Sequence, residues 1–354
     1  MAHDNQRRRT ESGFPFEVIF EILSWVAIEQ LLRFQFVCKD WYALIRNPEF
    51  IAKQYERASS LRKIPDIVKK QINGKTESIN VNKSYRKFAS SFGLFLEMSL
   101  TDNRSCRIRN PVTQQVVYLP DAHEGLNSFD FAINKSTGEC KVVCYYHSGE
   151  SEAGFQVITV GVDEQWRPLA HPNQDLLDEG ILCGDEGMFI GTGNGMGYFS
   201  DLVLDGDYLQ LEVHSLDIWK ECFTSTSPLP RGVFEDLTEV RFIQWNGGVA
   251  IAEIGDEDLG VMVLEDYKVS KWSERKIVVP LQILKDEPEL KEEIVHISAD
   301  SYELMLETES ERIYYDMTRQ KVITDYDKQS EDEGEAFTWL RPSLMALKGM
   351  KLEE

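Results

Sequence analysis

The sequence lacks the features of several large classes of protein. Its 354 residues include no run of eighteen apolar residues, so we expect no membrane-spanning helix and no membrane partner. No apolar stretch follows the charged N-terminus within signal-peptide range, which predicts an intracellular protein of the cytoplasm and/or nucleus. None of the six cysteines forms C-x-x-C or has a histidine at a matching spacing, so we expect buried free thiols rather than a zinc site.

Motifs of common catalytic and nucleotide-binding sites are also missing. The sequence contains no G-x-x-x-x-G-K-[ST], no G-x-S-x-G and no H-E-x-x-H. The glycine-rich run at residues 191–197 has Met196 where a dinucleotide fingerprint needs its third glycine, so we interpret it as a loop between strands. The acidic residues 256–258 lack the ligands of a calcium loop, and the six histidines are dispersed. The sequence therefore predicts no catalytic residue, no cofactor and no metal.

Positive charge is scarce in the long C-terminal part of the chain. Residues 94–354 hold 22 basic and 50 acidic side chains, a net charge of −28, whereas residues 61–93 hold eight basic and two acidic side chains. This acidity argues against nucleic acid as a partner. It is compatible with a protein partner that has a basic contact surface, although the solubility of the chain explains it as well.

The most informative stretch is residues 14–50, FPFEVIFEILSWVAIEQLLRFQFVCKDWYALIRNPEF. Apolar residues recur in it at helical spacing in three short patterns, which predicts three helices. The members of these patterns are Val18 and Ile22; Leu31, Leu32, Phe34 and Val37; and Trp41, Leu44 and Ile45. So small a unit cannot bury all of them within itself, so the surplus apolar surface requires either a larger domain or a partner protein.

This stretch resembles the F-box, the motif that docks a substrate receptor onto the Skp-type adaptor of a cullin–RING ubiquitin ligase. The family pattern is roughly L-P-x-E-[VIL]-x-x-E-I-L-S-x-L-P, then L-L-R-F-x-x-V-C-K-x-W, then L-I and a Phe. The matching residues are Pro15, Glu17, Val18, Glu21, Ile22, Leu23, Ser24, Leu31, Leu32, Arg33, Phe34, Val37, Cys38, Lys39, Trp41, Leu44, Ile45, Pro48 and Phe50. The sequence departs from the pattern at Phe14 and at residues 25–27, where Ala27 replaces a proline that fixes the turn between the first two helices.

The resemblance implies which residues contact the Skp-type adaptor and, through it, the cullin and RING subunits. By position in the motif these are Pro15, Ile22, Leu23, Leu31, Leu32, Val37, Cys38 and Trp41. For some of them, and Trp41 above all, holding the three helices together is the alternative role.

From about residue 92 the pattern changes to short strands separated by turns. Asn246-Gly247 accepts the positive φ angles of a tight turn, which predicts a hairpin there. Trp166, Trp219 and Trp272 lie 53 positions apart, each after a strand and a short polar turn. A repeat of this length predicts blades of a kelch-like propeller, five or six in number, with each tryptophan packed between neighbouring sheets. Three coincidental tryptophans in a β sandwich are the alternative.

The β region also resembles the F-box-associated domain found in many plant F-box proteins. The supporting segments are residues 109–113 (RNPVT) with Leu119-Pro120, residues 129–143, residues 157–166 and residues 262–272. The segment at residues 129–143 departs from the family in lacking its first glycine and in having Cys140 in place of a tyrosine. The order of these segments after an F-box extends the resemblance over most of the chain.

The expected fold class is α+β multidomain, with a small three-helix F-box followed by an all-β, propeller-like (kelch-like) domain. We expect a disordered N-terminus at residues 1–10, the F-box at 11–51, a basic linker at 52–91, the β domain at 92–347 and a C-terminal tail at 348–354. A helical arm packed on the F-box is the alternative for the linker. Residues 337–340 are expected to close the propeller beside residues 93–98.

The resemblance implies a non-catalytic substrate-recognition subunit of a Skp–cullin–F-box (SCF) ubiquitin ligase. The F-box would bind the adaptor, and the β domain would bind a protein client for ubiquitination and proteasomal degradation. The alternatives are a scaffold that binds the adaptor without degrading a client, and a kelch-like metal-dependent oxidase. The sequence does not identify the client or the residues that bind it.

Overall fold

The computed structural model describes residues 15–60, 70–72, 75–77, 85–102, 104–147, 153–170, 172–173, 188–191, 195–205, 208–300, 302–308, 310–327 and 343–353. The N-terminal residues 1–10 and the proposed closing residues 337–340 lie outside these ranges. The expectations for both therefore stay predictions.

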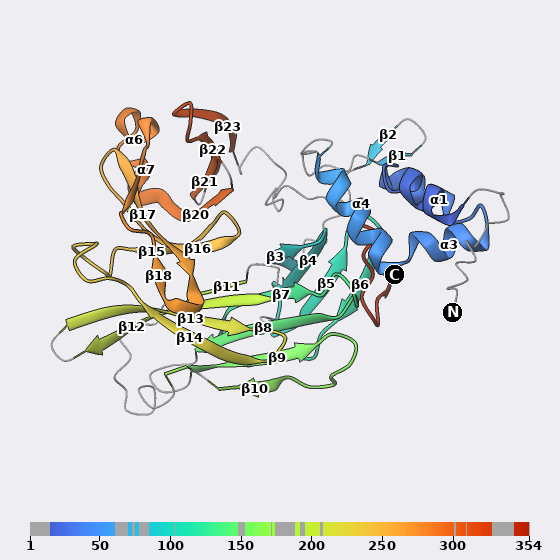
Figure 1. Ribbon diagram of the computed structural model, residues 1–354, viewed down its shortest axis with the longest axis horizontal. Helices are drawn as coiled ribbons and strands as arrows, with labels where there is room; N and C mark the ends of the chain where they lie inside the picture. The colour runs from blue at the N-terminus through green and yellow to red at the C-terminus, as the bar shows by residue number, and fades with distance from the viewer. Residues whose placement is uncertain are drawn as a thin grey trace, which may run out of the picture.

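Four helices form one end of the molecule (Figure 1): α1 (Phe16–Leu23), α2 (Ile28–Phe34), α3 (Lys39–Ile45) and α4 (Pro48–Ser60). Pro15 precedes α1 with a φ of −57°, a value that its ring favours. Asn47 precedes α4, and its side-chain oxygen accepts hydrogen bonds from the backbone N–H groups of Glu49 (2.8 Å) and Phe50 (3.3 Å). With Pro48 as the first helical residue, Asn47 forms a regular N-cap that starts α4.

Helix α4 differs from the expected domain boundary. The expected F-box ends at residue 51, and the residues after it are expected to be the end of the last helix followed by a basic linker up to residue 91, whereas α4 continues to Ser60. Phe50, Ile51 and Gln54 on α4 are buried, and Gln54 donates a hydrogen bond to the carbonyl of Val26. The helical arm named as the alternative is therefore what forms across residues 52–60, because α4 has a face that packs on the other helices.

The β region forms five successive antiparallel units of four strands within the described residues, which we call sheets one to five. Their strands, in chain order, are β3 (Tyr85–Ser91), β4 (Leu94–Ser99), β5 (Cys106–Asn110) and β6 (Gln115–Tyr118); β7 (Leu126–Ile133), β8 (Cys140–His147), β9 (Ala153–Thr159) and β10 (Arg167–Leu169); β11 (Met188–Gly191), β12 (Met196–Asp205), β13 (Tyr208–Asp217) and β14 (Cys222–Pro228); β15 (Arg241–Trp245), β16 (Gly248–Ile254), β17 (Asp258–Asp266) and β18 (Lys271–Trp272); and β20 (Ile294–Asp300), β21 (Glu303–Thr308), β22 (Glu311–Asp316) and β23 (Lys321–Asp327).

The remaining elements connect or extend these sheets. β19 (Ile277–Pro280) pairs with β17, and the short helices α6 (Gln282–Asp286) and α7 (Leu290–Glu293) lead from the fourth sheet to the fifth. β15 pairs in parallel with β20, which joins the fourth and fifth sheets. β1 (Lys70–Ile72) and β2 (Lys75–Glu77) form a separate hairpin.

The first strands of the five sheets are neighbours: β3 contacts β7, β7 contacts β11, β11 contacts β15 and β15 contacts β20. Four apolar cores accompany this order. One joins the helices with the first two sheets, and the other three lie between sheets two and three, three and four, and four and five. Innermost strands in series, with blades that extend outward, are the arrangement of a propeller, so the propeller-like prediction is confirmed over the sandwich.

The tryptophan repeat marks equivalent positions in the sheets. Trp166 Nε1 donates to the carbonyl of Pro120 (2.8 Å), just after the first sheet, and Trp272 Nε1 donates to that of Pro228 (2.9 Å), at the end of the third. Trp219 packs over Gly195, where any Cβ would collide with its ring. Trp166 and Trp272 therefore fasten the second and fourth sheets to the sheets before them, as the repeat predicts.

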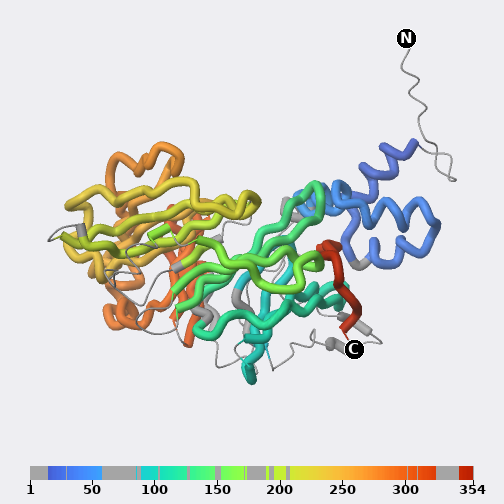
Figure 2. Tube along the Cα trace, turned by 90° about the horizontal axis from the view of Figure 1, so that it is seen from below, coloured from blue at the N-terminus to red at the C-terminus, as the bar shows by residue number. Residues whose placement is uncertain are grey.

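The C-terminal residues return to the first sheet, on the side of the helices (Figure 2). β24 (Lys351–Leu352) pairs antiparallel with β6, so residues 348–354, expected to be a tail, contribute a strand. The buried side chain of Asn110 donates hydrogen bonds to the carbonyls of Ser343 (3.0 Å) and Met345 (2.8 Å). The asparagine of the RNPVT segment therefore has a structural task, which is to hold the returning chain.

Candidate functional site

Helix α1 carries apolar side chains on two faces. Its inner face holds the buried Ile19 and Leu23, together with Phe20, whose ring meets that of Phe50 edge-on at 5.4 Å. Its outer face exposes the apolar side chains of Val18 and Ile22, four positions apart, and Trp25 in the turn after α1 is exposed as well. The inner face is buried against other parts of the chain, whereas the apolar side chains of the outer face are exposed to solvent.

The turn between α2 and α3 extends this pattern. Phe36 and Val37 are 81% and 61% exposed, and Tyr42 on α3 is also exposed, with the guanidinium of Arg46 lying 4.3 Å from its ring centroid. We call the six side chains Val18, Ile22, Trp25, Phe36, Val37 and Tyr42 the exposed apolar set. So much apolar exposure on three short helices is typical of a surface that binds another protein.

The structure divides the eight residues predicted to contact the adaptor. Ile22 and Val37 belong to the exposed apolar set, whereas Leu23 and Leu31 are buried, with exposures of 2% and 0%. Pro15, Leu32, Cys38 and Trp41 are partly exposed. Leu23 and Leu31 therefore hold the helices together in this structure and present no surface to a partner.

Trp41 has the structural role named as its alternative. Its ring meets that of Phe34 at 5.5 Å, and both rings pack against the core that the helices share with the first two sheets. Trp25, Phe36 and Tyr42 are exposed residues that the motif did not identify, because they fall at its variable positions or just beyond it. The available signal was an apolar residue outside the inner stripe of its helix.

Two cations of α4 surround a carboxylate of α1. Arg57 and Lys53 form ion pairs with Glu21 at 2.5 and 3.5 Å, and the hydrogen bond from Arg57 holds the pKa of the Glu21 carboxyl below its usual value. The Arg57 guanidinium also lies 4.6 Å from the ring centroid of Trp25. Helix α4 therefore contacts α1 at the edge of the exposed apolar set.

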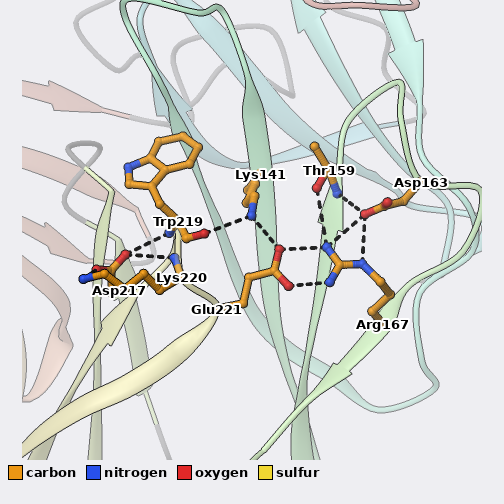
Figure 3. A network of polar contacts seen from close by, with 8 residues as sticks. All are labelled: Lys141, Thr159, Asp163, Arg167, Asp217, Trp219, Lys220 and Glu221. Atoms are coloured by element: carbon orange, nitrogen blue, oxygen red, sulfur yellow. Dashed lines mark hydrogen bonds and ion pairs between the residues drawn. The ribbon is translucent and has the colours of Figure 1, made fainter.

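A polar network joins the second and third sheets (Figure 3). Glu221 accepts hydrogen bonds from Lys141 (2.5 Å) on β8 and from Arg167 (2.8 Å) on β10, and Lys141 also donates to the carbonyl of Trp219 (3.2 Å). The bond from Arg167 lowers the pKa of Glu221 to about 2. A permanently ionised, paired carboxylate cannot act as a general acid or base near neutral pH, so we read the network as a clamp between sheets.

A second polar cluster lies in the third sheet. Asn173 donates to Nε2 of the buried His214 (3.1 Å) and to Asp201 (3.3 Å), and His214 Nδ1 is 3.0 Å from the hydroxyl of Thr226. Burial lowers the pKa of His214 to about 4 and raises that of Asp201 to about 6. Asn173, from the chain before β11, thus bonds two side chains of the third sheet, which gives these buried polar groups the partners that they require.

The described residues include most of the cysteines and the side chains that could bind a metal in a kelch-like oxidase. Cys106, Cys140 and Cys144 are buried, and burial raises the pKa of Cys106 and of Cys144 to about 12. Cys38 is partly exposed and Cys222 is exposed, so the expectation of buried thiols is wrong for these two, and Cys183 lies outside the described residues. Across the described ranges, no group of three His, Cys, Asp or Glu side chains has the arrangement of a metal site. None of the helices described is long and apolar enough to cross a membrane.

The acidic tip at residues 256–258 is partly neutralised within the chain. Asp256 lies 3.6 Å from the ammonium of Lys291, and Glu257 lies 2.6 Å from that of Lys285. The tip therefore contributes less negative potential than its sequence indicates.

Comparison with known proteins places the helices and sheets in one family. A model of the F-box domain matches residues 12–53, and a model of the F-box associated beta propeller domain matches residues 50–330. The chain belongs to the F-box-associated β-propeller family. An Arabidopsis thaliana protein named as an F-box protein is 24% identical over 335 residues, covering 86% of this chain and 83% of its own.

Other relatives of this F-box protein are similar over different lengths. A second Arabidopsis thaliana F-box protein is 23% identical over 327 residues, covering 78% of this chain and 90% of its own. An Arabidopsis thaliana F-box/LRR-repeat/kelch-repeat protein is 44% identical over 45 residues, 13% of each chain. The exposed apolar set lies within the F-box match, and the two polar clusters lie within the propeller match.

Proposed function

We propose that this F-box protein is the substrate-recognition subunit of an SCF ubiquitin ligase, in which the exposed apolar set binds the Skp-type adaptor and the propeller binds a protein client. One observation carries the proposal: the F-box leaves the apolar side chains of Ile22 and Phe36 in solvent, 59% and 81% exposed. Surface of this kind is stabilised by burial against a partner. Cullin and RING subunits would assemble through the adaptor, and ubiquitin transfer would be performed by them.

The arrangement of the chain supports this division of labour. The F-box lies at one end of the long axis and the fourth and fifth sheets lie at the other (Figure 1). The helices share one apolar core with the first two sheets, so the F-box is packed on the propeller rather than tethered to it. A client on the outer sheets would therefore be held at a defined distance from the adaptor, which raises the effective concentration of its lysines at the ligase.

The test of docking uses two exposed anchors. Ile22→Asp with Val37→Asp places charges where apolar contact is expected, so adaptor affinity should fall by more than about 100-fold. Thermal unfolding should be unchanged, because both side chains are already in solvent. Binding of a purified Skp-type adaptor to the full chain, by calorimetry or surface plasmon resonance, measures the effect.

A matched control places the same charges elsewhere. Val162 and Val269 are 60% and 69% exposed on the propeller, so Val162→Asp with Val269→Asp should leave adaptor affinity intact. Undiminished binding by the F-box variant, or an equal loss in the control, would contradict the assignment of the exposed apolar set.

The proposed client has a basic contact surface, because residues 94–354 carry a net charge of −28. Steering by this field weakens with salt, since the screening length falls from about 10 Å at 0.1 M to about 3 Å at 1 M. The association rate of a captured client should therefore drop across a salt series. A flat profile would mean that the acidity serves solubility and that recognition is apolar.

Degradation and location complete the proposal. We propose action in the cytoplasm and/or nucleus, where cullin ligases would meet the client. A scaffold that binds the adaptor without degradation would use the same F-box surface, so the docking test does not separate the two. Proteomics after loss of the gene does: a degradation receptor leaves a stabilised client, and a scaffold does not.

A further inference from the structure

The break between α1 and α2 is the weak point of the F-box in this chain. The family pattern places a proline there, whereas this chain has Ala27, which precedes α2 with a φ of −62° and no side-chain cap. Alanine does not restrict φ, so the turn from α1 to α2 keeps its backbone hydrogen bonds, from Trp25 to Ile22 (3.2 Å) and from Val26 to Leu23 (3.0 Å), but lacks the local restraint that a proline would add. The direction of this turn sets where the exposed Val18 and Ile22 of α1 lie relative to the exposed Phe36 and Val37.

Helix α4 contacts this break at several points. Arg57 Nη1 donates to the carbonyl of Glu21 (3.3 Å) and to the hydroxyl of Ser24, and Nη2 donates to the Glu21 carboxylate (2.5 Å). The same guanidinium stacks on Trp25. Gln54, which is buried, donates to the carbonyl of Val26 (3.3 Å).

We infer that Arg57 and Gln54 are positioning residues that take the place of the missing proline, so that the adaptor-docking unit of this chain includes α4 up to Arg57. This inference rests on the proposed function. A planar guanidinium presents its five donors in a rigid fork and can hold a carboxylate, a hydroxyl and a carbonyl in fixed positions, whereas the three donors of a lysine lie on one freely rotating nitrogen. Arg57 lies beyond the residues of the F-box match, which ends at 53.

Helix α4, which carries Arg57 and Gln54, also packs on the propeller. Tyr55 on α4 stacks on Phe92 with ring centroids 4.7 Å apart, and Glu56 lies 3.8 Å from the ammonium of Lys135. Lys135 also lies 4.8 Å from the ring centroid of Phe92. One face of α4 therefore holds α1 while another rests on the first two sheets, so the propeller helps to set the geometry of the adaptor surface.

The experiment compares Arg57→Ala, Arg57→Lys and Arg57→Ala with Ala27→Pro in the full chain. Loss of the guanidinium contacts should weaken binding of a purified Skp-type adaptor by about tenfold, and lysine should restore little of it. Ala27 already has the φ of proline, so Ala27→Pro should restore most of the affinity of Arg57→Ala and change the wild type little. Lys53→Ala is the control, since its pair with Glu21 is exposed on both sides.

A second measurement reads the break without the adaptor. Hydrogen exchange of the amides at residues 24–28 should quicken in Arg57→Ala and slow again when Ala27→Pro is added. Wild-type affinity in Arg57→Ala, or failure of Ala27→Pro to restore it, would overturn the positioning role. Failure of the wild-type chain to bind any Skp-type adaptor would instead overturn the proposed function, and the exchange data would then report a purely structural contact.

Discussion

The F-box and the first sheet of the propeller differ in the kind of side chain that each places against its usual environment. On α1, apolar side chains such as Ile22 remain in solvent, while in the first sheet the charged Glu97, Arg107 and Arg109 are buried. The exposed apolar residues contribute little to the stability of the fold, and burial would stabilise them only if a partner covered them. The buried charges are costly unless they are paired, so they report where the chain holds itself together. Exposed apolar surface thus distinguishes the F-box, and buried charge distinguishes the first sheet, in this molecule.

The buried charges form a closed set. The Glu97 carboxylate accepts from Arg107 (2.7 Å) and Arg109 (2.8 Å), and Arg107 also donates to Glu353 (2.7 Å) in the C-terminal segment. The Arg107 guanidinium lies 3.7 Å from the ring centroid of Tyr85. Two guanidinium groups therefore meet two carboxylates, and removal of one carboxylate leaves an uncompensated buried cation.

The largest effect expected is that of Glu97→Gln. It should lower the free energy of unfolding by about 3–5 kcal/mol, because it breaks two buried ion pairs from one side. Urea denaturation measures this loss. Glu124→Gln is the matched control, since its pair with Arg104 is exposed and should change stability by less than about 1 kcal/mol. Equal losses of unfolding free energy in the two variants would contradict the view that the buried charges stabilise the first sheet more than exposed ion pairs do.

The next effect separates the two faces of the F-box. Leu31→Ala should cost about 2–5 kcal/mol in unfolding free energy, because a fully buried side chain is removed. Ile22→Ala, on the exposed face, should change stability by less than about 0.5 kcal/mol and yet weaken adaptor binding. A stable Leu31→Ala variant that fails to bind would show instead that Leu31 contacts the adaptor directly.

The smallest effect on stability is expected for Glu221, the carboxylate of the polar network between the second and third sheets. The folded-state pKa of Glu221 is about 2, below its ordinary 4.5, so its contribution is complete above about pH 5 and disappears as the pH falls toward 2. Wild type should exceed Glu221→Gln in unfolding free energy by about 2 kcal/mol at pH 7, and the gap should close in acid. A gap that is constant between pH 7 and pH 2 would contradict the ionic role of Glu221.

Local features of the fold could be predicted from the sequence. The Asn-Gly hairpin forms as expected: Asn246 and Gly247 have φ values of 49° and 76°, and Trp245 pairs with Gly248. The tryptophan repeat identified equivalent positions because each blade repeats one short strand–turn unit. The three apolar patterns of the F-box motif fall on α1, α2 and α3 except for Val37, which lies in the turn after α2, whereas the fourth helix, α4, was not predicted as a separate element.

Long-range features could not be predicted in the same way. The motif does not distinguish Leu31 in the core from Ile22 in solvent, because both are apolar residues on helices and only packing against other elements separates them. The path of α4 beyond residue 51 depends on contacts with the first two sheets. The return of the C-terminal segment depends on Asn110, whose partners lie more than 230 positions along the chain.

The first sheet begins early in synthesis and is completed late. Arg107 and its partner Glu353 are 246 positions apart, so a growing chain carries the arginine long before the carboxylate exists. Until residues 343–353 have left the ribosome, β6 keeps an open edge and Asn110 lacks both of its carbonyl acceptors. A chain that stops before residue 343 would therefore expose the edge of β6 and leave Arg107 and Asn110 without these distant partners, so we expect it to aggregate.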